Sequence, residues 1–111
     1  MTRPDSKWQS HPSPVHSGEM KQWAEVLREL RSLLTRDPRT KPDLKAWTSD
    51  ANSLTRRIRS FPAVISNLVD EVAWHYLADA DIRVKDSEYA EMQRAEIEKW
   101  LHQSEQRLAG G

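Results

Sequence analysis

The longest apolar stretch of the chain lies between Phe61 and Leu77. On a helix at 100° per residue, most of its large apolar side chains fall within about 140° of arc, wider than the seam of a two-stranded coiled coil. The pattern therefore predicts a central helix over residues 61–77, contacted by more than one neighbour. Ser60 is placed to cap this helix, and Pro62 fits its first turn. The predicted core positions are Phe61, Val64, Ile65, Leu68, Val69, Val72 and Tyr76.

Two amphipathic patterns precede this stretch. The first predicts a helix that is capped by Ser17 or Gly18, runs to about Arg36, and is stopped by Asp37-Pro38. The second predicts a peripheral helix that starts after Thr40, where Thr40 and Asp43 resemble a capping box with Asp in place of Glu. Its apolar stripe is Leu44, Trp47, Ala51, Leu54 and Ile58.

A last helix is expected from Asp86 or Ser87 to about Leu108. Between residues 77 and 86 two readings are open: the central helix continues through Ile82, or a short loop uses Ile82 and Val84 to close the end of the bundle. The apolar side of the last helix also carries two polar residues. The positions on this side are Tyr89, Ala90, Gln93, Ile97, Trp100, Leu101, Ser104 and Leu108.

These patterns predict an all-α fold, a small antiparallel bundle of about four helices over residues 18–109. Residues 1–17 contain several prolines and serines and show no periodicity, so we expect a flexible tail. Its one aromatic residue, Trp8, is either pinned against the bundle or part of a short partner-binding motif. We expect the tail to be dispensable for folding.

Composition narrows the classes of function. The chain has no cysteine, which excludes thiolate metal sites, thiol catalysis and disulfides and is compatible with a reducing cytoplasm, where we expect the protein. The N-terminus has no apolar region typical of a signal peptide, and polar residues interrupt the longest apolar stretch, so we expect a soluble protein without a membrane span.

Charge is balanced in number but unevenly distributed. The 17 basic and 17 acidic residues give a net charge of zero. Residues 39–59 hold six basic residues against two acidic ones, whereas residues 66–111 hold ten acidic against five basic. Such polarity is suited to self-association or to a charged partner.

Candidate chemistry is sparse. Glu71, His75 and Asp79 follow one side of the central helix, and a carboxylate and an imidazole one turn apart can reach one metal ion. The Glu-x-x-x-His spacing differs from that of helix-bundle metal sites, so we interpret His75 as a partly buried residue bound to a neighbour. The acids after Leu77 do not fit a calcium loop, and no glycine-rich phosphate loop is present. We therefore predict no catalytic, cofactor or metal site and infer no small-molecule substrate.

The polar side of the second helix is the most informative surface. Lys41, Lys45, Arg56 and Arg59 share it at helical spacing, as phosphate contact or an acidic partner would require. Trp74 and Leu77 project away from the main stripe of the central helix, where they either meet another helix or form an exposed anchor. We predict a regulatory binding module for a protein partner or a second copy, with nucleic-acid binding or a small metal-dependent enzyme as alternatives.

Overall fold

The computed structural model describes residues 17–110, which form helices and no strand. The predictions for the tail and Trp8 lie outside the described residues. The helices are α1 (Ser17–Thr35), α2 (Lys41–Ser60), α3 (Ala63–Ser66), α4 (Glu71–Ala78), α5 (Ala80–Lys85) and α6 (Ser87–Gly110). The predicted all-α class is confirmed. Three long helices, α1, α2 and α6, account for most of the described chain, and the three short helices take the place of a fourth.

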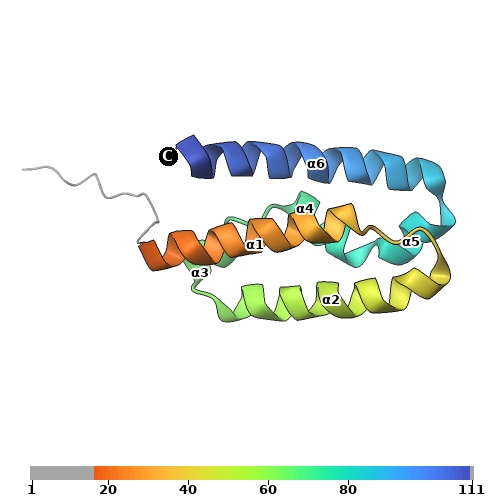
Figure 1. Ribbon diagram of the computed structural model, residues 1–111, viewed down its shortest axis with the longest axis horizontal. Coiled ribbons are helices and arrows are strands. Elements are labelled where there is room, and N and C mark those ends of the chain that lie inside the picture. The colour runs from red at the N-terminus through yellow and green to blue at the C-terminus, as the bar shows by residue number, and fades with distance from the viewer. Residues whose placement is uncertain (1–16, 111) are drawn as a thin grey trace, which may run out of the picture.

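The long helices are arranged side by side, with α6 and α2 on opposite sides of the molecule (Figure 1). Helix α1 lies between them and packs against both, while α4 and α5 also contact α2 and α6. The core is therefore enclosed by every long helix and by the short helices together. Its buried apolar residues are Val26, Leu27, Leu30, Leu33, Trp47, Ala51, Leu54, Ile58, Val69, Ala73, Tyr76, Leu77, Ala80, Ile97 and Leu101.

The ends of the long helices lie close to the predicted positions. Helix α1 ends at Thr35, just before Asp37-Pro38, and Thr40 is the N-terminal cap position of α2. The Thr40 hydroxyl lies 3.0 Å from a carboxylate oxygen of Asp43 and donates to it, so it does not accept a backbone N–H as a capping box would require. The Asp86 carboxylate accepts the backbone N–H of Tyr89 at 3.0 Å, which caps α6.

The predicted continuous helix over residues 61–77 is wrong. The chain turns between Ser66 and Glu71, which separates α3 from α4. Leu68, which the pattern placed in the middle of the core, lies in this turn and is 37% exposed. Ser60 belongs to the last turn of α2, where its hydroxyl donates to the carbonyl of Arg57, so it caps no following helix.

Asp70 explains why the chain turns at this point. Its side chain accepts the backbone N–H of Val72 at 3.0 Å and so starts a new helix at Glu71. Short polar side chains such as those of Ser, Asn and Asp compete with the helical backbone for hydrogen bonds, which weakens a helix interior and favours a cap. The apolar periodicity of the sequence continues across Asp70, but the capping hydrogen bond of Asp70 begins a new helix there.

Neither interpretation of the segment after Leu77 is correct: it does not continue the preceding helix, and it is not a loop that closes the bundle with Ile82 and Val84. It forms a separate helix, α5, in which Ile82 is 42% exposed and Val84 is half-buried. The buried residue between them is Arg83. A polar cluster therefore closes this end of the bundle. None of the helices in the described range 17–110 combines the length and the apolar character that a membrane-spanning helix needs.

Candidate functional site

The outward side of α2 carries the four cations that the sequence singled out. Lys41, Lys45, Arg56 and Arg59 are all exposed. At 1.5 Å of rise per residue, they form a row about 27 Å long. The exposed polar side chains of Ser49, Asn52 and Ser53 occupy the space between the two pairs of cations. We call the four cations the α2 basic face.

Two other exposed or half-buried arginines of the long helices, Arg31 and Arg57, are neutralised by acids from neighbouring helices. Arg57 binds Glu29 and lies 3.4 Å from Glu25, which ties α2 to α1. Arg31 binds Glu98 at 2.6 Å and Glu105 at 2.8 Å, which ties α1 to α6. The hydrogen bond from Arg31 to Glu98 lowers the pKa of the Glu98 carboxyl.

The α2 basic face differs from these arginines because it lacks acidic partners. The side chains of Lys41 and Lys45 make no ion pair or hydrogen bond with any residue of the described range 17–110. Within the described residues, the only hydrogen bond or ion pair of the Arg56 side chain is a 3.4 Å hydrogen bond to Ser53. The face is therefore an unneutralised positive surface.

Arg59 connects the α2 basic face to an aromatic side chain of α4. Its guanidinium lies over the ring of Trp74, 5.9 Å from the ring centroid. Trp74 is half-buried and packs against the core. The α2 basic face and Trp74, which the sequence analysis treated as two separate candidate surfaces, thus meet at this contact. Leu77 does not belong to them: it is buried in the core, and we do not retain it as a partner-binding residue.

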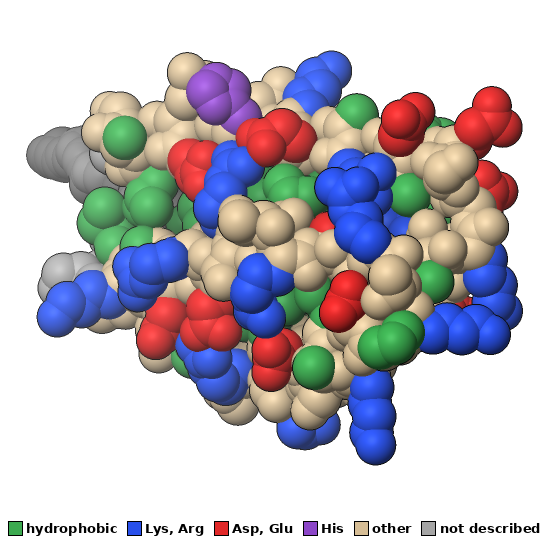
Figure 2. All heavy atoms as spheres, turned by 45° about the vertical axis from the view of Figure 1, so that its right-hand side comes forward, with side chains coloured by type: hydrophobic (Ala, Val, Ile, Leu, Met, Phe, Trp, Pro, Cys, Tyr) green, Lys and Arg blue, Asp and Glu red, His purple; other side chains and the backbone are tan. Residues whose placement is uncertain are grey.

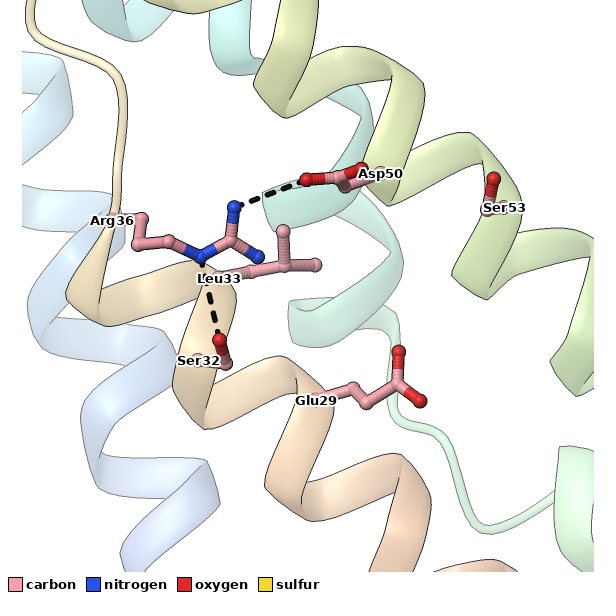
Figure 3. Close-up of a pocket in the computed structure, with 6 residues that line it drawn as sticks. All are labelled: Glu29, Ser32, Leu33, Arg36, Asp50 and Ser53. Atoms are coloured by element: carbon pink, nitrogen blue, oxygen red, sulfur yellow. Dashed lines mark hydrogen bonds and ion pairs between the residues drawn. The ribbon is translucent and has the colours of Figure 1, made fainter.

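A shallow polar groove lies beside this surface, between α1 and α2 (Figure 3). Its volume is about 140 Å³, and an ion pair crosses it from Arg36 to Asp50 at 3.0 Å. The lining residues are Glu29, Ser32, Leu33, Arg36, Asp50 and Ser53. A groove of this size and polarity is suited to a few water molecules, and it gathers no catalytic arrangement of side chains.

The most elaborate polar arrangement is buried and was not foreseen. Asp37, between α1 and α2, faces Arg83 of α5, and the two side chains are 1% and 0% exposed. Arg83 donates to an oxygen of Asp37 at 3.0 Å and to Gln93 at 2.7 Å. Tyr76 and Arg94 also donate to Asp37, at 2.6 and 3.1 Å. Opposite charges and hydrogen bonds thus offset the cost of burying these groups.

Aromatic rings complete the surroundings of Arg83. Its guanidinium lies 4.0 Å from the ring centroid of Tyr76 and 4.9 Å from that of Trp47. Burial and the hydrogen bond to Asp37 raise the pKa of the Tyr76 phenol, which keeps this hydroxyl a donor. The cluster joins α2, α4, α5 and α6, so we interpret it as structural. The sequence signal that could have revealed it is Gln93, a polar residue on the apolar side of α6.

The three residues considered for metal binding are not brought together as a site. Asp79 accepts from the hydroxyl of Tyr89 at 2.6 Å and from Gln93 at 3.1 Å, and the first of these bonds is the main reason that its pKa is lowered. Glu71 and His75 are exposed, so the expected partial burial of His75 is wrong. No group of three or more His, Asp or Glu side chains that could hold a metal ion occurs among residues 17–110.

Comparison with known proteins gives no relative: no family model, no curated protein and no solved structure matches this chain significantly.

Proposed function

We propose that this protein is a binding module that recognises an acidic surface of a protein partner through the α2 basic face and Trp74. The observation that carries the proposal is that four exposed cations follow one another along one side of α2 without an acidic partner among the described residues. Arg31, Arg36 and Arg57 are held by acids, whereas Lys41 and Lys45 have no partner within residues 17–110. Cations left unpaired in a row are available to an approaching partner and speed its encounter.

Trp74 and Arg59 supply the side chains that dominate protein interfaces. Trp and Arg are enriched among the residues that contribute most of the binding free energy, particularly where they lie next to each other and exclude water. Trp74 is already supported by the core, so little conformational freedom would be lost when a partner covers it. The cations would then orient the partner, and the indole would provide the apolar contact.

A pull-down with the full chain tests the proposal. The wild-type protein should retain a partner after nuclease treatment. The double variant Lys45→Gln/Arg56→Gln should capture at least tenfold less of that partner than the wild type does. The matched control is Lys21→Gln/Arg28→Gln, which removes two exposed cations from α1. Equal capture by both double variants would contradict a role for the α2 basic face.

Nucleic-acid binding is the second candidate, favoured by the exposed Ser49, Asn52 and Ser53 between the cations. Hydroxyl and amide groups interleaved with cations contact phosphate oxygens in many protein–DNA interfaces. In this case every nucleic acid would bind similarly. The slope of log affinity against log salt would fall by about 0.7–0.9 for each cation removed, because fewer counterions are released. We favour the protein partner because the net charge of zero gives little long-range attraction for a polyanion.

We propose no catalytic activity, cofactor or small-molecule substrate, because the exposed polar residues described above do not converge on a reacting centre. A cytoplasmic location remains part of the proposal and rests on the absence of cysteine.

A further inference from the structure

The outward side of α6 carries a second charged surface of the opposite sign. Glu88, Met92 and Glu96 follow one another at intervals of four residues, so they form a line on one side of the helix, and Glu91 lies beside them. We call these four residues the α6 acidic face. All four are exposed, and Met92, at 48%, is the most exposed large apolar side chain among the described residues.

The acids of this face are unneutralised, unlike the other glutamates of α6. Glu98 and Glu105 bind Arg31 of α1. In contrast, Glu88, Glu91 and Glu96 have no ion pair or hydrogen bond to a side chain of the described residues. Unpaired acids on one surface attract a basic partner, and the exposed Met92 among them offers that partner an apolar contact.

The two charged faces point in opposite directions. Helices α2 and α6 lie on opposite sides of α1, and the outward side of each faces away from the core (Figure 1). Figure 2 shows acidic side chains gathered at the upper right, where α6 begins, and basic side chains along the lower edge, over α2.

We propose that the α6 acidic face of one molecule binds the α2 basic face of a second copy of this chain. The inference rests on the proposed function of the α2 basic face and names its partner. Charge complementarity supports it, because the cations and the acids are both exposed and have no partner of opposite charge among residues 17–110. The net charge of zero also means that copies do not repel one another at long range.

The geometry determines the form of the assembly. A two-fold dimer would require each molecule to use both faces against the same partner at once. Faces on opposite sides of the molecule cannot do so. The contact is therefore head-to-tail, and each added copy leaves one free face of each sign. Association should be open-ended and should weaken as salt screens the charges.

Sedimentation equilibrium of the full chain tests this inference. At about 20 mM salt, the weight-average mass should rise with concentration beyond twice the 12.9 kDa of the monomer, and at about 300 mM salt it should return toward 12.9 kDa. Lys45→Gln/Arg56→Gln and Glu88→Gln/Glu96→Gln should each be monomeric alone. Mixed together, they retain one intact face each and should form a complex of two chains that grows no further. Lys21→Gln/Arg28→Gln should associate as the wild type does.

The outcomes separate this inference from the proposed function. A wild-type chain that remains monomeric at low salt up to millimolar concentration would overturn the self-association. If the nuclease-treated pull-down still depended on Lys45 and Arg56, the proposed function would stand. If the wild type stayed monomeric and the pull-down did not depend on Lys45 and Arg56, both proposals would be overturned. A dimer that stops growing in the wild-type protein would also overturn the head-to-tail arrangement.

Discussion

Asp37 and Arg83 lie 46 positions apart in the chain and meet in the interior, where Arg83 Nη2 is 2.9 Å from Asp37 Oδ1. The pair connects the loop after α1 to α5. Because both side chains are buried, their mutual attraction is screened by solvent far less than that of the surface pairs. Removing Arg83 leaves the buried Asp37 with only Arg94 and the Tyr76 hydroxyl as partners, and removing Asp37 leaves the buried Arg83 without an ion-pair partner among the described residues.

Arg83→Met should therefore destabilise the protein by about 3–5 kcal/mol, the usual cost of breaking a buried pair by removing one partner. Arg36→Met is the matched control, since it removes the half-exposed pair with Asp50 and should cost about 1 kcal/mol or less. Urea denaturation of both variants provides the comparison. Equal midpoints for Arg83→Met and the wild type would show that the pair contributes no stability.

Tyr89→Phe should raise the pKa of Asp79 toward its ordinary value, because the Tyr89 hydroxyl is the main cause of the lowered pKa. A carboxyl whose pKa is lower in the folded state stabilises the protein above its unfolded pKa of about 3.9, and this contribution is lost as the pH falls through the folded pKa. The wild type should thus lose more stability than Tyr89→Phe below about pH 4. Carboxyl NMR titration measures the pKa directly; an unchanged Asp79 pKa in Tyr89→Phe would contradict this assignment.

Leu68→Ala should have a small effect, about 1 kcal/mol or less, because Leu68 is exposed in the turn between α3 and α4. Ile65→Ala, three residues away and fully buried, should cost about 2–5 kcal/mol. The sequence pattern alone would have assigned the large loss to Leu68. Thermal and urea unfolding of the two variants distinguish the helix that the pattern predicted from the turn in the structure.

Arg59→Gln should separate binding from stability. An exposed cation over an aromatic ring contributes about 0.5–1 kcal/mol, so the variant should unfold nearly as the wild type does while capturing less partner. Trp74→Ala should lower both, because the half-buried indole also packs against the core. If Arg59→Gln captured as much partner as the wild type, Arg59 would be excluded from the interface.

Local signals were sufficient to predict the three long helices. Pro38 stops α1, and Asp86 caps α6, each through contacts within a few residues. The break between α3 and α4 was missed because apolar periodicity records which side chains could face a core. It does not record the competition between the helix and the capping hydrogen bond of Asp70.

The exposed part of the candidate site could also be predicted, since helical spacing places Lys41, Lys45 and Arg56 on one side of α2 whatever the tertiary structure. The sequence could not predict which cations remain unpaired, because the acids that neutralise Arg57 come from another helix. The buried position of Arg83 depends in the same way on residues distant in sequence, Asp37 above all.

The placement of the α2 basic face and the α6 acidic face on opposite sides separates positive from negative charge across the molecule. Its isoelectric point of about 6.9 describes only the sum of its charges. Near that pH and at low salt, such a molecule can adsorb to a cation exchanger through one side and to an anion exchanger through the other. Each resin would hold it in a fixed and opposite orientation, leaving the other charged face toward the solvent.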